Sequence, residues 1–342
     1  MAFPTTLPDP THTPLRGGPT LRWGVLGPGQ IAHDFITATH AQTDQRAVAV
    51  GSRSLERAED FARRHGIARA YSSYEELVAD PEVDIVYISS PHSEHREHAL
   101  LAIAAGKHVL VEKPIALSAR EAEGIAEAAR AAGVFAMEAM WTRFQPKSTV
   151  IRQLLDDGVL GELDVAIADF AFRADFDPSG RMFNPALGGG GLLDLGVYTV
   201  WFAQFALGAP AAVHAEGRLA STGVDDRASV TLEYASGATA LLYVSLVANT
   251  ANRGLIAGSD GFIDVPEFAS PGGFVLSGGG QRLEFVEPDG FRWREGLCYQ
   301  AAAVAKHIAD GLTEAPEHPL STTIAQLTTI DAARTALGYA PA

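Results

Sequence analysis

Three side chains of this sequence are of types that exchange protons with a substrate. Lys113 stands in the tripeptide Glu112-Lys113-Pro114, and Asp194 and Tyr198 follow much later in the chain. A phenol with an ordinary pKa of about 10 is a poor base at neutral pH. A neighbouring ammonium stabilises the phenolate and lowers that pKa. Tyr198 with Lys113 is therefore a chemically sensible acid–base pair, and a tyrosine packed in the core is the alternative.

A run of four glycines at 188–191 precedes Asp194 and Tyr198. Such a run cannot form a stable helix interior, and we expect it to let the backbone lie close to a flat cofactor ring. From Leu192 the pattern is helical, so Asp194 and Tyr198, at i and i+4, share one face of the helix. Asp194 is therefore a third catalytic candidate, and capping of its helix is the alternative for its carboxylate.

A glycine-rich turn upstream, Gly27-x-Gly29-x-x-Ala32, follows a predicted strand and opens a predicted helix. That context matches the fingerprint of a turn that binds a dinucleotide phosphate. Gly27 permits the tight turn, Gly29 lets the backbone approach a pyrophosphate, and Ala32 lets helix and strand pack closely. The helix N-terminus, with Gln30 and Ile31 in its first turn, faces the phosphate charge. Glycine turns also occur without a ligand, which is the structural alternative.

The end of the second predicted strand favours NADP as the cofactor. An NAD enzyme usually has Asp or Glu there to bind the ribose hydroxyls, whereas this chain has Ser52-Arg53-Ser54 and no carboxylate. A hydroxyl and a guanidinium suit a 2′-phosphate, because arginine binds phosphate with two parallel hydrogen bonds. Arg57, one helical turn later, adds positive charge. NAD is the less favoured cofactor, and a solvated loop position is the alternative for Arg53.

Further polar residues follow the fourth and fifth predicted strands, at the carboxyl edge where parallel sheets bind ligands. Ser90, Pro91 and His95 come after the fourth strand, and Glu112 and Lys113 end the fifth. We expect all five to bind the cofactor, with Pro91 and His95 on its nicotinamide side. A lysine there would bind a substrate oxygen or lower the pKa of a proton donor.

The histidines at 92, 95 and 98 have a three-residue spacing that suggests a metal site at first sight. No cysteine and no second acidic cluster accompanies them. Capping of the helix by Ser93 and ordinary packing explain the spacing better, so the sequence predicts no metal.

Strands and helices alternate from Leu21 onward. Short strands with few charges, separated by helices, indicate a parallel sheet covered on both faces. The predicted strands are 22–26, 47–51, 70–71, 85–89, 109–112 and 134–138, and the predicted helices are 30–39, 55–65, 74–79, 94–105 and 119–132.

The character changes after Trp141, where one helix at 146–156 leads into alternating strands that predict an α+β domain with a mostly antiparallel sheet. The hairpin break Ala235-Ser236-Gly237 supports that sheet type. Helical segments at 299–310 and 321–336 close the chain, and we expect the last to pack back on the first domain. The predicted strands are 164–172, 212–219, 228–234 and 238–247, then shorter ones near 253–257, 262–265, 274–276 and 282–286.

Composition excludes several classes of protein. The 342 residues suggest two domains, and the net charge of −15 argues against nucleic-acid and membrane-surface partners, which need basic patches. One cysteine, Cys298, fits a reducing compartment, and no apolar run reaches the roughly 18 residues that a membrane span requires, so we expect a cytoplasmic protein. Residues 1–20 have five prolines and no secretory signal. We expect a mobile tail or an arm laid on a neighbouring subunit.

The chain resembles the glucose–fructose oxidoreductase/inositol dehydrogenase (Gfo/Idh/MocA) family over nearly all its length after residue 20. The glycine turn, Glu112-Lys113-Pro114, and the motif from Gly189 to Tyr198 carry the resemblance. Many members have histidine where this chain has Tyr198. Tyrosine there, together with the octapeptide 137–144 (MEAMWTRF), is similar to the branch of dimeric dihydrodiol dehydrogenases and NADP-dependent D-xylose 1-dehydrogenases.

The resemblance implies an α/β fold: a doubly wound Rossmann domain at 21–140 and an α+β domain at 141–320 whose large open sheet forms a dimer face, before a C-terminal helix at 321–342. It implies a homodimer or dimer of dimers. Tyr198 would be the acid/base and Lys113 its partner. A substrate pocket is expected around the residues Trp141, Arg143, Phe144, Arg173, Phe176, Asn184 and Tyr198, with Arg181 nearby; core packing for Trp141 and loop positions for the later residues are the alternatives.

These observations together predict an NADP-dependent oxidoreductase that transfers a hydride at a carbinol carbon of a sugar, such as an aldose, or of a vicinal diol. A nucleotide-sugar ketoreductase is the alternative within enzymes, since that group also pairs lysine with tyrosine. A non-catalytic NADP-sensing regulator on the same fold is the alternative outside enzymes. The presence of Lys113, Asp194 and Tyr198 together argues against that last reading.

Overall fold

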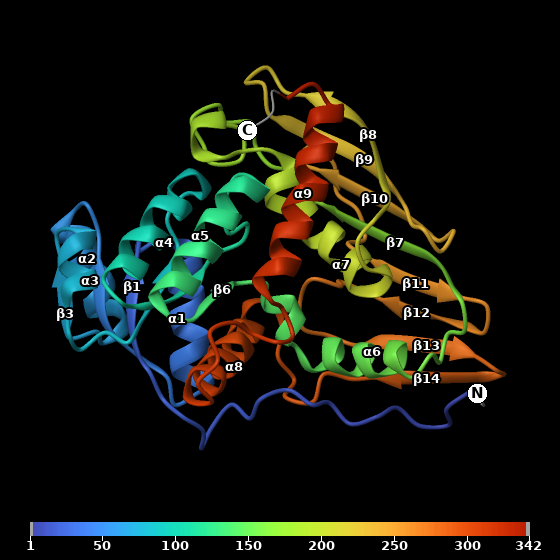
Figure 1. The fold of residues 1–342 in the computed structure, drawn as a ribbon, viewed down its shortest axis with the longest axis horizontal. Helices are drawn as coiled ribbons and strands as arrows, with labels where there is room; N and C mark the ends of the chain where they lie inside the picture. The colour runs from blue at the N-terminus through green and yellow to red at the C-terminus, as the bar shows by residue number, and fades with distance from the viewer. Residues whose placement is uncertain (1–2, 340–342) are drawn as a thin grey trace. The chain divides into compact units, whose positions relative to one another are not determined.

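The computed structural model describes residues 3–339, which form two compact units (Figure 1). The N-terminal unit consists of His12–Phe144 and Trp293–Ile324. The C-terminal unit consists of residues 3–11, Gln145–Arg292 and 325–339. Each unit has its own sheet and its own core.

Two parts of the chain belong to a different unit from the one that sequence order suggests. Residues 293–320 were expected in the second domain, but α8 (Leu297–Ala309) packs on α1 (Gln30–Gln42) in the N-terminal unit. The closing helix α9 (Leu320–Ala336) was expected on the first domain. Only its first turn belongs there, and from Ala325 onward the helix is part of the C-terminal unit.

The N-terminal unit is built on a six-stranded sheet of order β3-β2-β1-β4-β5-β6 with every neighbouring pair parallel. This is the strand order of a doubly wound dinucleotide-binding fold, so the predicted fold class is confirmed. Its strands are largely buried and rich in β-branched residues, as a sheet covered on both faces requires. They are β1 (Arg22–Leu26), β2 (Arg46–Gly51), β3 (Arg69–Tyr71), β4 (Ile85–Ile88), β5 (His108–Val111) and β6 (Ala136–Glu138).

Local signals set the helices of this unit. Serines at 54, 73 and 118 cap three N-termini, and each hydroxyl accepts a hydrogen bond from a backbone N–H of the first turn. Gly66 and Gly133 end two of these helices in the left-handed conformation that suits glycine. The helices capped in this way are α2 (Leu55–His65), α3 (Tyr74–Ala79) and α5 (Ala119–Ala132), and α4 (His95–Ala104) follows a short 3-10 turn, η1 (His92–Glu94).

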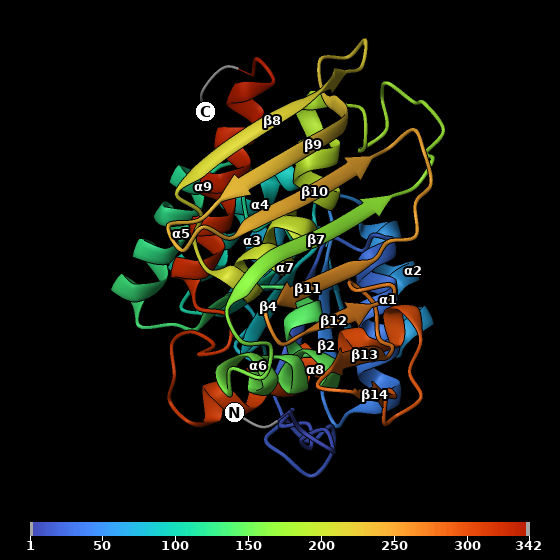
Figure 2. The same cartoon turned by 90° about the vertical axis from the view of Figure 1, so that its right-hand side faces the viewer.

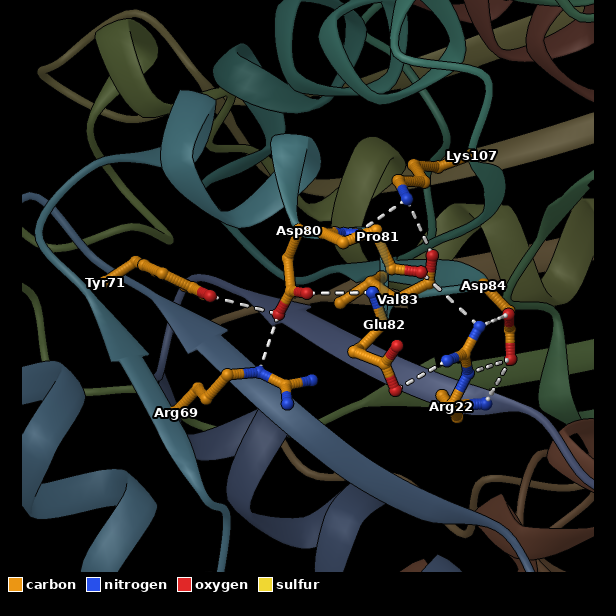
Figure 3. A network of polar contacts seen from close by, with 9 residues as sticks. All are labelled: Arg22, Arg69, Tyr71, Asp80, Pro81, Glu82, Val83, Asp84 and Lys107. Atoms are coloured by element: carbon orange, nitrogen blue, oxygen red, sulfur yellow. Dashed lines mark hydrogen bonds and ion pairs between the residues drawn. The ribbon is translucent and has the colours of Figure 1, made fainter.

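A polar network joins β1, β3 and β4 near the amino ends of the central strands (Figure 3). Asp84 accepts hydrogen bonds from the backbone N–H of Arg22 at 2.8 Å and from its guanidinium at 2.7 Å. Asp80 accepts from Arg69 Nε at 2.7 Å, and the Lys107 ammonium donates to the Asp80 carbonyl at 2.8 Å. The network fixes the loop between α3 and β4.

The C-terminal unit is built on an eight-stranded sheet of order β14-β13-β12-β11-β7-β10-β9-β8. Only the central pair of β7 and β10 is parallel, so the prediction of a large, mostly antiparallel sheet is confirmed. The strands are β7 (Leu163–Ala171), β8 (Ala212–Leu219), β9 (Asp225–Glu233), β10 (Thr239–Ser245), β11 (Gly254–Gly258), β12 (Gly261–Val265), β13 (Phe274–Gly278) and β14 (Gln281–Phe285).

Helices of the C-terminal unit cover one face of this sheet. α6 (Pro146–Asp156) and α7 (Val197–Leu207) lie behind the strands in Figure 2, where the strands face the viewer. The stretch Pro185–Leu207 is long and apolar enough to pass for a membrane span, contrary to the expectation from the sequence. Because 89% of its apolar window is buried inside the protein, it serves here as a core element.

The start of the chain has defined contacts, where the sequence suggested a mobile tail. In the C-terminal unit, the Phe3 ring packs over glycines of the β13–β14 turn. The Asp9 carbonyl accepts a hydrogen bond from Gln153 of α6 at 3.0 Å. In the N-terminal unit, Arg16 pairs with Asp44 at 3.3 Å.

Candidate functional site

The glycine turn has the geometry that its motif predicts. Gly27 has a φ of 92°, and a Cβ there would lie 3.1 Å from the Ser90 nitrogen, so the fold requires glycine at this position. Gly29 has an ordinary extended backbone, and a Cβ there would meet nothing closer than the Ser89 carbonyl oxygen at 3.9 Å. Packing within the protein therefore does not explain Gly29, whereas close approach of a phosphate to the backbone does.

The N-terminus of α1 has no side-chain cap, as is also true of α4 and α8 in the same unit. Its N-cap is Gly29, which provides no side-chain hydrogen bond, whereas α2, α3 and α5 are each capped by a serine hydroxyl. The first-turn N–H groups, including those of Gln30 and Ile31, therefore suit an external anion. The Gln30 amide donates to Asp34 Oδ1 at 2.8 Å, so its side chain lies along the helix. These residues fit the diphosphate of a dinucleotide.

A polar cavity of about 710 Å³ lies beside the end of β2, where the adenosine ribose of a dinucleotide is expected. Arg53 lines it and is 72% exposed, and its guanidinium pairs with Glu94 at 3.1 Å. Tyr74 and His98 form an edge-to-face aromatic pair in its wall, with ring centroids 4.6 Å apart. Burial raises the pKa of Tyr74, and the positive charges of Arg53 and Arg57 oppose that rise. Arg53 and Arg57 therefore place two cations in or near this cavity, and Glu75, Glu94 and Glu97 also line it.

Ser52 does not share the exposure of Arg53. It is buried, and its hydroxyl accepts a hydrogen bond from the Ser54 backbone N–H at 3.2 Å. The hydroxyl thus shapes the β2–α2 turn that presents Arg53. A direct phosphate contact stays a prediction for Arg53 and Arg57. For Ser52 the structure shows a hydrogen bond within the β2–α2 turn.

His95 lies at the predicted edge of the sheet, but its side chain is engaged within the protein. It is completely buried, and its two ring nitrogens lie 2.8 Å from the carbonyl oxygens of Ser90 and Pro114. Burial lowers the pKa of His95 to about 4. The ring therefore connects two loops at the carboxyl edge of the sheet. Ser90 is also engaged, because its hydroxyl lies 2.8 Å from His98 Nδ1, while Pro91 is the N-cap of η1.

Glu112 and Lys113 separate into different environments at the end of β5. Glu112 is buried, and its Oε1 accepts a hydrogen bond from the Tyr87 hydroxyl at 2.5 Å. Burial raises the pKa of this carboxyl group. A direct contact of the Glu112 side chain with a cofactor does not fit that position. Lys113 is half-buried, its backbone N–H donates to Glu112 Oε2 at 3.3 Å, and the Lys113–Pro114 peptide bond is cis.

The glycine run of the C-terminal unit is explained within the protein. A Cβ at Gly189 would lie 2.8 Å from the Met182 carbonyl oxygen, and one at Gly190 would lie 2.5 Å from Asp225 Oδ1. The expected approach to a cofactor ring is therefore not needed to account for these glycines. Asp225 is buried at the start of β9, and its Oδ2 accepts a hydrogen bond from the Leu192 N–H at 2.7 Å. The carboxylate thus anchors the start of the next helical turn.

That next turn, η4 (Leu192–Gly196), is a π-helix, where the sequence predicted an ordinary helix from Leu192. Single π-turns are frequent at functional sites. Asp194 in this turn is buried and pairs with Arg181 at 3.0 Å, and the N-cap of the turn is Gly191, so Asp194 is not the capping residue that was the alternative to a catalytic role. Tyr198 follows in the first turn of α7, largely buried, with its ring edge-on to Phe170 of β7 at 5.3 Å.

The predicted substrate contacts are divided between the two units. In the N-terminal unit, Trp141, Arg143 and Phe144 form a buried 3-10 turn, η2 (Trp141–Phe144), and Arg143 Nε donates to the Glu317 carbonyl at 2.9 Å. In the C-terminal unit, three residues lie in the loop that follows β7. Arg173 is exposed, Phe176 is 55% exposed and packs edge-on to Phe183, and the Asn184 side chain caps the short turn η3 (Pro185–Leu187).

Comparison with known sequences and structures places both units in one family. Residues 21–140 match the family described as an oxidoreductase family with an NAD-binding Rossmann fold, and residues 149–264 match the GFO/IDH/MocA C-terminal domain. The chain belongs to the Gfo/Idh/MocA family. It is an NAD(P)-dependent dehydrogenase. The predicted resemblance is confirmed.

Members of the Gfo/Idh/MocA family align with nearly the whole chain. The trans-1,2-dihydrobenzene-1,2-diol dehydrogenase of Mus musculus is 39% identical over 327 residues, covering 93% of this chain and 97% of the relative, and the Xenopus laevis enzyme of that name is 36% identical over 93% and 98%. The aldose–aldose oxidoreductase of Caulobacter crescentus, solved with glycerol, superimposes with a TM-score of 0.84 at 27% identity, covering 93% of this chain and 97% of that structure. A 3-ketoreductase of Actinomadura kijaniata, solved with NADP and TDP-benzene, gives 0.79 at 28% identity, covering 93% and 98%.

Three residues beside the predicted site in this family member were not expected from its sequence. Glu138 accepts a hydrogen bond from the Ile115 N–H, directly after the Lys113–Pro114 segment. His318 and Thr323, far along the chain, both contact the same carboxylate. Glu138 stands within the octapeptide 137–144, which is the one sequence signal that pointed near it.

Proposed function

We propose that the protein is an NADP-dependent dehydrogenase of the CH–OH group of a vicinal diol or an aldose. The observation that carries this proposal is 39% identity over nearly the full length to an enzyme named for a dihydrodiol, with the lysine and tyrosine needed for proton exchange present in this chain. The lower identity, 28%, to a 3-ketoreductase solved with a nucleotide-linked ligand favours a free vicinal diol over a nucleotide sugar.

We infer that the N-terminal unit holds the cofactor by its phosphates. The open N-terminus of α1 and the Gly27–Gly29 turn would bind the diphosphate, and Arg53 with Arg57 would bind the 2′-phosphate. No carboxylate ends β2, where an NAD-selective enzyme would need one. Glu94 now pairs with Arg53, so phosphate binding would exchange that partner. When bound, the nicotinamide would accept or supply the hydride.

Residues of this chain would transfer the proton to and from the substrate hydroxyl. In oxidation, the Tyr198 phenolate would remove the hydroxyl proton of the substrate while hydride leaves the same carbon, and in reduction it would return that proton. The Lys113 ammonium would lower the pKa of Tyr198 so that enough phenolate exists near neutral pH. Asp194, paired with Arg181, would fix the turn that precedes Tyr198. This pairing of Lys113 with Tyr198 is part of the proposal.

The test is formation of NADPH when the protein is mixed with NADP and a panel of trans-dihydrodiols and aldopyranoses. Tyr198→Phe should abolish turnover and leave the Kd for NADP unchanged, because the aromatic ring remains and only the proton-carrying hydroxyl is lost. Tyr234→Phe removes a buried hydroxyl from the same unit and serves as the control. Tight NADP binding without turnover on any substrate would instead favour a dinucleotide-sensing role.

We also propose a homodimer formed through the open face of the eight-stranded sheet. On that face the side chains of Ile167, Leu241 and Leu255 stand beside one another across three adjacent strands, and Phe262 follows on the next. Ile167, Leu241 and Phe262 are 37%, 46% and 41% exposed. Contiguous exposed apolar side chains of this kind mark an interaction surface.

The oligomeric state can be tested by light scattering. Leu241→Arg should convert the dimer to monomer, since it puts a charge at the centre of the apolar face. The control is Leu312→Arg, because Leu312 is 37% exposed but lies in the N-terminal unit. A wild-type monomer would refute the proposed dimer.

The single buried cysteine, Cys298, supports the further proposal of a cytoplasmic location.

A further inference from the structure

One peptide group next to Lys113 is held at both of its polar ends. The peptide joins Pro114 to Ile115: its N–H donates to Glu138 Oε1 at 3.0 Å, and its carbonyl oxygen lies 2.8 Å from His95 Nδ1 and accepts a hydrogen bond in the tautomer that carries the ring proton on Nδ1. Both partners are completely buried. The plane of this peptide is therefore fixed by contacts from two different elements, α4 and β6.

Glu138 is itself held by residues from the far end of the chain. Its second oxygen, Oε2, lies 3.1 Å from His318 Nε2 and accepts a hydrogen bond from the Thr323 hydroxyl at 3.1 Å. His318 and Thr323 also contact each other at 3.1 Å. All three side chains are buried within the N-terminal unit. A carboxylate without exposure to water is costly unless such partners satisfy it, so this arrangement specifies one position for Glu138.

The fixed peptide restricts Lys113 through proline. The ring of Pro114 locks its φ, and a residue before proline is confined to extended backbone conformations. Few rotatable bonds therefore separate the Pro114–Ile115 peptide, which Glu138 holds, from the Cα atom of Lys113. A small rotation of that peptide would displace the ammonium by an amount that matters for proton exchange, because about 1 Å of misplacement can cost about 10²-fold in rate.

We propose that Glu138 is a positioning residue for Lys113 and that His318 and Thr323 keep Glu138 in place. This inference rests on the proposed acid–base role of Lys113. Glu138 touches neither substrate nor cofactor in this account, and it acts through the backbone. The segment Trp293–Ile324, which carries His318 and Thr323, thereby contributes to the reaction. It carries none of the reacting groups.

The experiment compares Glu138→Met, which keeps the side-chain length and removes the acceptor, with Glu138→Gln, whose amide oxygen can still accept from Ile115. We expect kcat to fall by about 10²-fold in Glu138→Met and much less in Glu138→Gln, with the Kd for NADP unchanged in both. The pH profile of kcat/KM for oxidation should also move. Its rising limb, which reports loss of the Tyr198 proton, should shift to higher pH because the ammonium no longer lies where it lowers that pKa.

A second pair of variants keeps the inference testable if Glu138→Met does not fold. Thr323→Val removes one contact to Glu138, and Thr329→Val makes the same change at a buried threonine of α9 whose hydroxyl bonds Ala325 and Gln204 instead. The free energy of unfolding should fall by a similar amount in both variants. Only Thr323→Val should lower kcat per NADP-binding site and shift the pH profile.

Lys113→Met, assayed in parallel, distinguishes a failure of the positioning role of Glu138 from a failure of the proposed acid–base role of Lys113. If Lys113→Met is slow while Glu138→Met and Thr323→Val keep the wild-type rate and pH profile, the positioning role of Glu138 is overturned and the proposed function stands. A loss of rate without any shift of the profile also overturns it, because that is what a purely structural network would give. If Lys113→Met keeps full activity, the acid–base assignment fails and the inference fails with it.

Discussion

Asp225 should make the C-terminal unit less stable at neutral pH than in mild acid. Its carboxylate is 1% exposed, beside the glycine run, and burial raises its pKa from an ordinary 3.8 to about 6. The charge is partly satisfied by the Leu192 N–H and by the Tyr339 hydroxyl, which donates at 3.0 Å. These contacts do not offset the loss of hydration.

The size of the effect follows from linkage. A folded pKa about two units above the unfolded one means that the folded state binds more protons between about pH 4 and pH 6. The contribution of this group is therefore fully present below pH 4 and is lost as the pH rises through 6. At about 1.4 kcal/mol per unit, the loss is about 3 kcal/mol by pH 7.

Asp225→Asn should remove this dependence, because the amide oxygen can still accept from Leu192 and no charge is buried. The measurement is the free energy of unfolding in urea from pH 4 to pH 8 for the wild type and the variant. We expect the variant to gain up to about 3 kcal/mol over the wild type as the pH rises through 6. Parallel pH curves for the two proteins would refute the reasoning.

Asp84→Asn provides a control of opposite sign. Hydrogen bonds from Arg22 hold the pKa of Asp84 below its usual range, so its stabilising contribution is present above the unfolded pKa and is lost as the pH falls. The difference between wild type and this variant should therefore grow as the pH rises to about 4 and stay level from there to neutral pH, with the wild type the more stable, so the unfolding measurement for this pair extends below pH 4. If both aspartate variants gave the same slope, a general charge effect and not these specific contacts would be responsible.

Three further results are expected. Lys113→Met should lower kcat by about 10²-fold or more with little effect on the Kd for NADP, as for loss of an acid–base group; stopped-flow and equilibrium titration would check this, and a silent change would make the lysine structural. Arg53→Glu should weaken NADP relative to NAD by more than about 1 kcal/mol, measured by calorimetry, and equal losses for both cofactors would contradict a 2′-phosphate contact. Glu94→Gln should strengthen NADP binding, because Arg53 is released from its 3.1 Å ion pair; unchanged affinity would show that the pair does not compete with the ligand.

Local signals explain why most secondary structure could be predicted. The serine caps at 54, 73 and 118 and the glycine ends at 66 and 133 act through contacts within one helical turn, so the sequence pattern is enough to place α2, α3 and α5. The strand order of the first sheet also follows, because the turn motif and the alternation of strands and helices belong to a doubly wound fold.

Residues expected to bind the cofactor were harder to judge, because burial is not a local property. His95 and Glu112 stand at the correct edge of the sheet, as their positions after β4 and β5 require. Their side chains are nevertheless buried against backbone carbonyls and Tyr87, respectively. A sequence position gives the edge of the sheet but not the direction in which the side chain leaves it.

The sequence by itself determined the family, the two sheets and the glycine turn, and it supplied the lysine and tyrosine of the proposed reaction, since each depends on residue type and short spacing. Tertiary structure decided what surrounds them. The contacts of Asp225 with the glycine run and of His318 and Thr323 with Glu138 join residues far apart in the chain, and no local pattern encodes such pairs. The physical reason is that packing of distant segments, rather than the chemistry of any one segment, determines which polar groups lose water and which partner they then require.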